Sequence, residues 1–288
     1  MNTDKKIFTT GKFFTIILLA YFLFSSAYAK PIVFTFTGTT LKEDLKTYLQ
    51  WQKYIQDKSK LDIQIKFART YAEVVSNIRD KKSDIAYVCG STYTVLKDQQ
   101  DARLLVIPRT EGTNIYYADI IALKDSKYKS LNDFENTTFA FTDAQSTSGS
   151  IAPTYYILKN GYNINTFFKH LIYTYDHGES IEAVLNSFVD GASVDSLVFT
   201  QYAQKYPTEI KKLKIVEKLG PYTISPIVIR QNLDEKTFHT LQQIFLNMHT
   251  TKEGKKILNH LNIDKFEQPS NQTYDKVYEM MNYIKINK

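Results

Sequence analysis

The chain has a single cysteine, Cys89, and only 10 glycines and 7 prolines among its 288 residues. One cysteine cannot form an intramolecular disulfide, so a disulfide scaffold is excluded and stability must come from a buried core. The scarcity of glycine and proline excludes long flexible linkers. Cys89 follows the apolar run 85–88 at the end of an expected strand. That position favours a buried, inert thiol over a catalytic nucleophile.

Metal-binding and nucleic-acid-binding patterns are missing as well. The 5 histidines show neither HxxxH nor HxH spacing, and no cysteine cluster supports them, so we expect no metal site and no cofactor. The formal charge is +6, but the lysines and arginines are scattered along the chain and form no basic stripe. This distribution gives no support to nucleic-acid binding. With 43% hydrophobic, 14% aromatic and 23% charged residues, the composition is typical of a soluble globular protein.

Residues 1–29 have the layout of a secretory signal peptide. Lys5, Lys6 and Lys12 precede the apolar run 13–24, and Ala27-Tyr28-Ala29 carries small residues at its first and third positions. The pattern predicts cleavage before Lys30. The alternative is an uncleaved N-terminal anchor, although the apolar run is short for a span of about 20 residues. No cysteine follows the run, which excludes bacterial lipid attachment at that point.

From residue 32 onward, segments with strand and helix periodicity alternate. In the first part we expect strands at 32–36, 62–67, 84–88 and 104–107, and helices at 41–58, 71–82 and 93–98. In the second part we expect strands at 115–123, 138–142, 172–175, 194–199, 215–219 and 224–229, and helices at 131–135, 148–160, 180–188, 234–261 and 274–286. This order predicts an α/β fold whose sheets are mostly parallel and flanked by helices.

The pattern divides into two lobes. The chain is expected to cross near 110–118 and to return near 221–228, which gives a first lobe of residues 30–113 and 223–288 and a second lobe of residues 114–222. Two such lobes joined by a two-segment hinge can trap a ligand between them, where strand ends and helix N-termini meet.

The clearest site motif is Ser146-Thr147-Ser148-Gly149, which lies between an expected strand and an expected helix. Unpaired backbone N–H groups, the helix dipole and three hydroxyls can together hold a tetrahedral oxyanion without a cation. The alternative is ordinary helix capping, because serine and threonine are favoured N-caps. A single hydroxyl is enough for a cap, so three in a row favour the anion site.

Several motifs, taken in order, resemble those of the periplasmic solute-binding proteins of phosphate, phosphite and phosphonate ABC transporters. The run 146–149 is similar to the anion turn of that family. The strand Asp84-Ile85-Ala86-Tyr87 and the later Tyr93 resemble a strand and aromatic of the family. The segments 177–181, 189–196 and 225–228 are similar to its middle turn, its Val-Asp segment and its returning hinge strand.

The resemblance implies a two-lobed, type II periplasmic binding fold that closes on a small oxyanion and delivers it to an inner-membrane permease. Carried over by position, the ligand-binding residues are Tyr93, Ser146, Thr147, Ser148, His177 and Asp195. The chain departs from many family members at Cys89-Gly90, where they carry Gly-Pro. The implied location is the periplasm, and we expect a stable monomer.

Three of the polar candidates have alternative roles. His177 lies just ahead of the expected helix 180–188 and could satisfy backbone carbonyls; as a ligand residue it would make binding depend on pH between about 5 and 7. Asp195, at the start of an expected strand, would repel a bound anion. It could still contact the ligand by binding an amino group of the ligand, as on an aminoalkylphosphonate, or by accepting a P–OH proton. Glu179 admits the same role, or that of an acid in the first turn of a helix.

Two other functions compete with the importer component. A sensor could use the same binding fold with residues 1–29 kept as an anchor. A hydrolase could use Ser148, His177 and Asp195 as a triad, but no Gly-x-Ser-x-Gly motif surrounds any serine. We therefore expect a binding protein and no enzyme.

Overall fold

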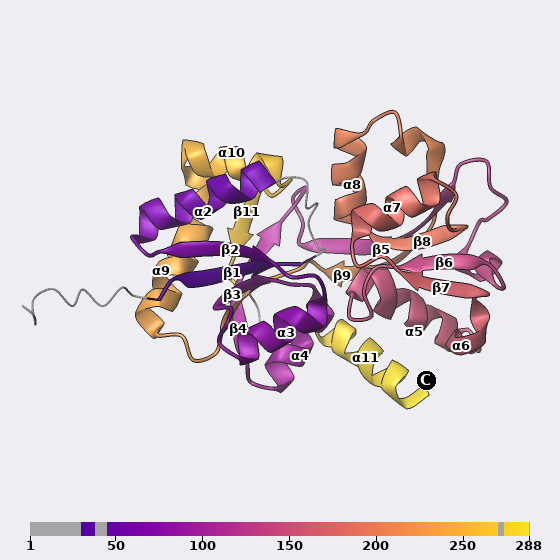
Figure 1. Ribbon diagram of the computed structural model, residues 1–288, viewed down its shortest axis with the longest axis horizontal. Coiled ribbons are helices and arrows are strands. Elements are labelled where there is room, and N and C mark those ends of the chain that lie inside the picture. The colour runs from indigo at the N-terminus through magenta and orange to yellow at the C-terminus, as the bar shows by residue number, and fades with distance from the viewer. Residues whose placement is uncertain (1–29, 38–44, 270–273, 288) are drawn as a thin grey trace, which may run out of the picture. The chain divides into compact units, whose positions relative to one another are not determined.

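Two β-sheets, each covered by helices, organise the chain (Figure 1). The computed structural model describes residues 30–37, 45–269 and 274–287. The expected signal peptide, 1–29, and the start of the expected helix 41–58 lie outside the described residues. None of the helices in the described part of the chain is both long and apolar enough to cross a membrane.

The six-stranded sheet defines the first lobe. Its order is β11-β4-β10-β3-β1-β2. Its strands are β1 (Ile32–Phe36), β2 (Ile63–Phe67), β3 (Ile85–Tyr87), β4 (Ala102–Arg109), β10 (Ile227–Arg230) and β11 (Lys265–Glu267). β1 pairs in parallel with β2 and β3, whereas β10 runs antiparallel to both β3 and β4.

The five-stranded sheet defines the second lobe, with the order β7-β6-β8-β5-β9. Its strands are β5 (Ile115–Leu123), β6 (Thr138–Phe141), β7 (His170–Tyr173), β8 (Gly191–Asp195) and β9 (Leu213–Thr223). β6 pairs in parallel with β7 and β8, and β5 runs antiparallel to β8 and β9.

The α/β class is as expected, and most strands of each sheet run in one direction, but both sheets also contain antiparallel strands. The reason lies in the two crossings between the lobes. A parallel neighbour needs a crossover connection, usually a helix, that returns the chain to the same end of the sheet. β5 and β10 enter directly from the other lobe, so each runs against the strands beside it.

The helices lie around the two sheets (Figure 1). In the first lobe they are α2 (Leu45–Ser59), α3 (Tyr71–Arg79), α4 (Gly90–Asp98), α9 (Glu235–Leu246), the 3-10 turn η5 (Met248–Thr250) and α10 (Lys252–His260). In the second lobe they are the 3-10 turns η2 (Leu131–Phe134) and η4 (Ile210–Lys212), the π-helical turn η3 (Thr147–Ile151), α5 (Ala152–Lys159), α6 (Ile164–Phe167), α7 (His177–Leu185) and α8 (Ser196–Lys205).

The last helix, α11 (Asp275–Asn287), packs on both lobes. Tyr274, just before it, is buried in an apolar cluster of the first lobe, whereas Val277 and Met280 are buried in the core of the second. The lobe boundaries expected from the sequence remain a prediction, but α11 links the lobes at a place outside the two crossing segments.

Helix capping corrects three of the expected elements. The expected strand 194–199 ends at Asp195, because the Asp195 side chain caps α8 from Ser196 onward. The expected helix 180–188 begins three residues earlier, at His177, where Asp176 caps it. The expected helix 234–261 is two helices, α9 and α10, whose N-caps are Asp234 and Thr251. Aspartate and threonine accept from free N–H groups of a first turn, so they mark helix starts within a polar sequence.

Candidate functional site

The turn Ser146-Thr147-Ser148-Gly149, which we call the anion turn after the motif that it resembles, lies between β6 and α5 in the second lobe. Ser146 caps the π-helical turn η3 by accepting a hydrogen bond from the Gly149 N–H across 3.0 Å. Ser146, Thr147 and Ser148 are all buried, at 0–1% exposure. A Cβ at Gly149 would lie 2.6 Å from the Thr142 side chain, so this close approach requires glycine. The three hydroxyls predicted from the sequence are therefore held together inside the molecule.

His177 lies beside this turn. Its Nδ1 is 2.9 Å from Thr142 Oγ1 and accepts a hydrogen bond from the Asp195 N–H across 3.1 Å, while its Nε2 is 3.5 Å from Ser146 Oγ. Burial lowers the pKa of His177 to about 3, because a charged imidazolium would lose its hydration. The imidazole is therefore neutral at physiological pH. A neutral ring would not make binding depend on pH between about 5 and 7, so this pKa favours a pH-independent role for His177.

Asp195 completes the polar group on this lobe. It is buried at the end of β8 and accepts from the Leu197 and Val198 N–H groups at 2.8 and 3.4 Å. Burial raises the pKa of Asp195 to about 7, these two hydrogen bonds oppose the rise, and the nearby Asp119 adds to it. Burial also raises the pKa of Asp119 to about 6, although Lys218 lies 3.8 Å away.

Two tyrosines that the sequence analysis missed join these residues. Tyr71, the first residue of α3, and Tyr116, on β5, have buried hydroxyls with no hydrogen-bond partner among the described residues. Burial raises the pKa of both well above 10, Asp195 and Cys89 add to this, and hydroxyls of the anion turn oppose it. In a chain with 21 tyrosines, residue type alone gave no signal for these two.

We call Tyr71, Tyr116, Ser146, Thr147, Ser148, His177 and Asp195 the buried polar cluster. Tyr71 belongs to the first lobe and the other members belong to the second. A cavity of about 30 Å³, the space of about one water, adjoins Asp195 and is also lined by Tyr87, Leu197 and Ser225. The cluster thus lies where the two lobes meet.

The Thr147 hydroxyl is hydrogen-bonded to Ser91 of the first lobe. Its Oγ1 accepts from the Ser91 N–H across 2.9 Å and donates to Ser91 Oγ across 3.0 Å. The Ser91 hydroxyl in turn donates to the Gln145 carbonyl. Because a hydroxyl has one hydrogen to give, Thr147 can offer a ligand its backbone N–H but not its hydroxyl while these bonds persist.

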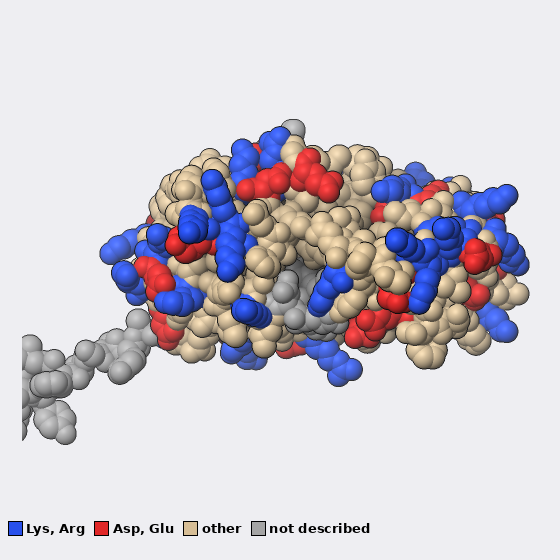
Figure 2. All heavy atoms as spheres, turned by 90° about the horizontal axis from the view of Figure 1, so that it is seen from above, with Lys and Arg blue, Asp and Glu red and all other residues tan. Residues whose placement is uncertain are grey.

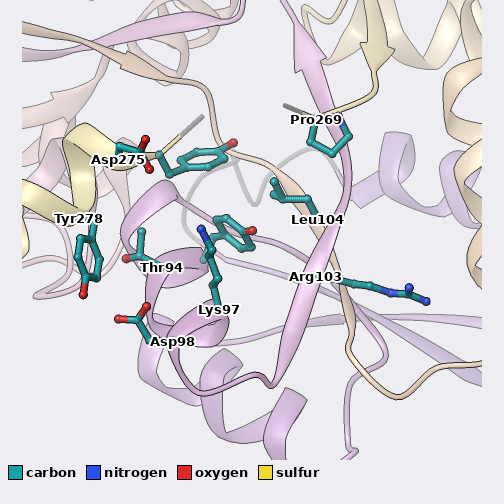
Figure 3. Close-up of a pocket in the computed structure, with 10 residues that line it drawn as sticks. Thr94, Lys97, Asp98, Arg103, Leu104, Pro269, Asp275 and Tyr278 are labelled. Atoms are coloured by element: carbon teal, nitrogen blue, oxygen red, sulfur yellow. The ribbon is translucent and has the colours of Figure 1, made fainter. Parts of the chain in front are cut away.

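Tyr93 and Glu179, also predicted as ligand residues, are placed elsewhere. Tyr93 packs edge-on against Tyr274, with ring centroids 5.1 Å apart, and lines a separate pocket of about 620 Å³. Figure 3 shows Lys97 and Asp275 reaching this pocket from α4 and α11. Glu179 is an exposed residue in the first turn of α7, which is the alternative role of a first-turn acid.

The arrangement does not form the hydrolytic triad considered above. The serine hydroxyl near His177 Nε2 belongs to Ser146 rather than Ser148. Asp195 meets Nδ1 through its backbone N–H, not through its carboxylate. A triad needs the carboxylate to accept from the imidazole N–H, so the roles of Asp195 and His177 are reversed here.

Charged and metal-binding groups give no other site of this kind. Among the described residues, no three His, Cys, Asp or Glu side chains are grouped so that they could hold a metal ion. On the face shown in Figure 2, lysines and arginines alternate with acidic residues and form no continuous basic stripe. Cys89 is buried as expected, with its sulfur 3.1 Å from the hydroxyls of Ser91 and Thr92.

The chain crosses twice between two mixed sheets, and a buried polar cluster lies where the two lobes meet. This arrangement defines a two-lobed ligand-binding protein. Solved structures share this fold. A binding protein component of an ABC phosphonate transporter from Pseudomonas aeruginosa has a TM-score of 0.83 and 25% identity, covering 88% of this chain and 87% of that one. PhnD1 from Prochlorococcus marinus in complex with methylphosphonate has a TM-score of 0.79 and 19% identity, covering 89% and 98%.

Sequence comparisons give the family. The profile of the family described as "ABC transporter, phosphonate, periplasmic substrate-binding protein" matches residues 34–274. The phosphonates-binding periplasmic protein of Escherichia coli (strain K12) is 29% identical over 240 residues, which cover 81% of this chain and 70% of that protein. The chain therefore belongs to the periplasmic substrate-binding proteins of the phosphonate ABC transporter family. The two-lobed fold and the family predicted from the sequence are confirmed.

Proposed function

We propose that this chain captures a small phosphorus oxyanion (phosphonate, phosphite or phosphate) between its lobes and delivers it to an inner-membrane ABC permease. The observation that carries the proposal is the Ser146–Ser148 turn, with its buried hydroxyls beside the donor Nε2 of a neutral His177. Family membership supports the same function. In this proposal the protein binds and releases its ligand without chemical change.

The buried polar cluster suits an oxyanion that must be released again. It consists of hydroxyls, an imidazole, a carboxyl group and backbone N–H groups, and it contains no lysine or arginine. Neutral donors recognise a tetrahedral anion by the directions of their hydrogen bonds. The unpartnered hydroxyls of Tyr71 and Tyr116 are natural donors to such a ligand, because a buried hydroxyl without a partner is unfavourable. We propose that Ser146, Ser148, His177, Tyr71 and Tyr116 donate to it, and that Thr147 does so through its backbone.

Asp195 controls the protonation state of the ligand in this proposal. A buried carboxylate beside an oxyanion would repel it, but a pKa near 7 allows Asp195 to carry or receive a proton. One proton is then shared between the Asp195 carboxyl group and a phosphorus oxygen. The bound form therefore holds one proton more than the fully ionised pair.

The mature protein in this proposal begins at Lys30, after removal of the signal peptide 1–29, and acts as a monomer in the periplasm. The sensor alternative retains the N-terminal segment as an anchor. N-terminal sequencing of the exported protein separates the two: Lys30 as the first residue supports the soluble receptor, and an intact Met1 supports the anchored sensor.

The direct test is a thermal-shift screen of the exported chain, followed by calorimetry, with phosphate, phosphite, methylphosphonate, aminoethylphosphonate and sulfate. A ligand at one hundred times its Kd adds about 2.7 kcal/mol to the free energy of unfolding, a shift that is easily measured. We expect a selective shift with one or more phosphorus compounds and none with sulfate. No shift with any phosphorus compound would contradict the proposal, and an equal response to sulfate would contradict its phosphorus specificity.

A further inference from the structure

The loop 143–149, which includes the anion turn, also contacts the N-termini of two helices in the first lobe. The N–H of Tyr71, the first residue of α3, donates to Asp143 Oδ2 across 3.2 Å. The N–H of Ser91, the second residue of α4, donates to Thr147 Oγ1 across 2.9 Å. Cys89, the N-cap residue of α4, makes no capping hydrogen bond with its own side chain. Side chains of one lobe thus satisfy free N–H groups of helices in the other.

Asp143 is the charged member of these contacts. It is buried, and its other oxygen, Oδ1, accepts from the Gln145 N–H within its own turn across 2.8 Å. No lysine or arginine forms an ion pair with Asp143 among the residues that the structure describes. A carboxylate at a helix N-terminus is stabilised by the free N–H groups and the helix dipole. For Asp143 this stabilisation comes from α3, in the opposite lobe.

Elsewhere in the interface between the lobes, neutral side chains form hydrogen bonds between α8 and the residues that follow α10. Gln201 Nε2, on α8, donates to the Leu261 carbonyl of the first lobe across 3.0 Å. Asn262 Nδ2 donates to Gln204 Oε1 across 2.9 Å. Because hydrogen bonds to charged groups contribute more than neutral ones, Asp143 provides the strongest single contact of these between the lobes.

We propose that Asp143 is a positioning residue that holds the closed state: its carboxylate adds to the cap that Thr70 already gives α3, by accepting from the Tyr71 N–H across the interface, only while the lobes are together. The inference rests on the proposed receptor function, in which the lobes open to release ligand. Asp143 acts without touching the ligand, through the equilibrium between open and closed states. When the lobes separate, the hydrogen bond from the Tyr71 N–H to Asp143 Oδ2 breaks. The hydrogen bond from the Gln145 N–H to Asp143 Oδ1 lies within one loop and persists. Asp143 therefore slows ligand release.

The sharpest variant is Asp143→Asn. The carboxylate has two acceptor oxygens and serves both Gln145 and Tyr71, whereas an amide has one oxygen and can serve only one of them. The substitution keeps the shape of the side chain and removes one bond and the charge. Asp143→Ala removes both bonds. The matched control is Asp234→Ala, which removes a cap inside the first lobe, where Asp234 accepts from the Thr237 N–H across 2.9 Å.

We call the hydrogen bond between Asp143 and the Tyr71 N–H the latch. Two measurements on the full mature chain test whether it holds the closed state. The first is the interlobe distance in ligand-free protein, measured between spin labels at Lys58→Cys and Phe188→Cys, two exposed positions in different lobes. The second is the dissociation rate of phosphite and of methylphosphonate in stopped flow. We expect Asp143→Asn to shift the distances toward the open state and to raise the dissociation rate about five- to tenfold, the size of a lost cap, with a larger effect for Asp143→Ala. Asp234→Ala should lower only the melting temperature.

The outcomes separate the latch from the receptor. Unchanged distances and dissociation rates in both Asp143 variants overturn the latch, as does a fall in melting temperature alone, like that of the control. If the wild type binds neither phosphite nor methylphosphonate, the receptor proposal is in question while the ligand-free distances still decide the latch. A wild type that stays open with and without these ligands also overturns it, because the contact then holds nothing closed.

Discussion

The backbone N–H of Asp195 donates a hydrogen bond to Nδ1 of His177 across 3.1 Å. An N–H can only donate, so Nδ1 must be the unprotonated nitrogen, and the proton of the neutral ring lies on Nε2. Burial lowers the pKa of His177 to about 3, which keeps the ring neutral throughout the physiological range. The strand end at Asp195 thus fixes the tautomer of His177 and leaves Nε2–H as a permanent donor beside Ser146.

Replacing His177 should weaken oxyanion binding by a constant factor at every pH. We expect His177→Ala to raise Kd about tenfold or more, the effect of one lost hydrogen bond to a charged acceptor. The shape of the pH profile should be unchanged, because the wild-type ring does not titrate between pH 5 and 8. Calorimetry at pH 5.5, 6.5 and 7.5 tests this. A profile that becomes flatter in the variant would instead mean that the imidazolium form binds.

Ser148→Ala tests the anion turn itself. Ser148 is buried at the start of η3, and its carbonyl accepts from Ser193 Oγ across 2.7 Å, so the turn is anchored independently of the Ser148 hydroxyl. We expect the substitution to weaken binding by about 1–3 kcal/mol, because a charged acceptor loses one donor. Ser130→Ala, which removes a capping box in the same lobe, is the control and should affect stability alone. Equal affinities of Ser148→Ala and wild type would remove Ser148 from the site.

His177 and Asp195 were assigned by resemblance, whereas the turn 146–148 was predicted from the residues themselves, because it lies between an expected strand and an expected helix. That local signal comes from capping chemistry, and it is visible along the chain. It could not find Tyr71 and Tyr116, whose role depends on which residues the two crossing strands bring face to face. The sequence also could not predict that β5 and β10 run antiparallel to their neighbours, because apolar and polar residues alternate in the same way in a strand of either direction. Tyr93 was assigned by resemblance alone, and the structure places it in another pocket.

The two tyrosines offer a test that separates binding from stability. Tyr71→Phe and Tyr116→Phe remove buried hydroxyls that have no partner among the described residues, so the ligand-free protein should lose little or no stability. Each variant should bind the oxyanion about tenfold more weakly, since a donor to a charged ligand is lost. Calorimetry and thermal unfolding of the same preparations give both quantities.

Tyr274→Phe is the matched control for these variants. The Tyr274 hydroxyl is also buried, but it donates to the Ile224 carbonyl across 2.7 Å. Its removal should lower the free energy of unfolding by about 1 kcal/mol and leave affinity unchanged. If Tyr71→Phe and Tyr116→Phe behave like this control, their hydroxyls serve the fold rather than the ligand.

Asp195 should make ligand affinity depend on pH near neutrality. With one proton shared between its carboxyl group and the ligand, affinity is highest below the Asp195 pKa of about 7. Above it the proton must be taken from solution, so Kd should rise by up to tenfold per pH unit. Asp195→Asn keeps a donor and removes the titration, so its Kd should be flat from pH 6 to 8.5 apart from the ionisation of the ligand itself. A wild-type Kd equally flat over that range would contradict the shared proton.

The same group should make the ligand-free protein less stable as pH rises, the opposite of an acid whose pKa is lowered on folding. Its pKa is raised from 3.8 when unfolded to about 7 when folded, so the folded state binds more protons between these values. The contribution of Asp195 to the free energy of unfolding must therefore fall as pH rises through this window, by at most about 1.4 kcal/mol per pH unit. Denaturant unfolding from pH 4.5 to 8 should give a more negative slope in the wild type than in Asp195→Asn. The slope that remains in the variant combines Asp119, whose pKa is raised to about 6 and which acts in the same direction, with His177, whose lowered pKa acts in the opposite direction below about pH 6.5. Identical slopes in the two proteins would show that Asp195 is ionised in the folded state.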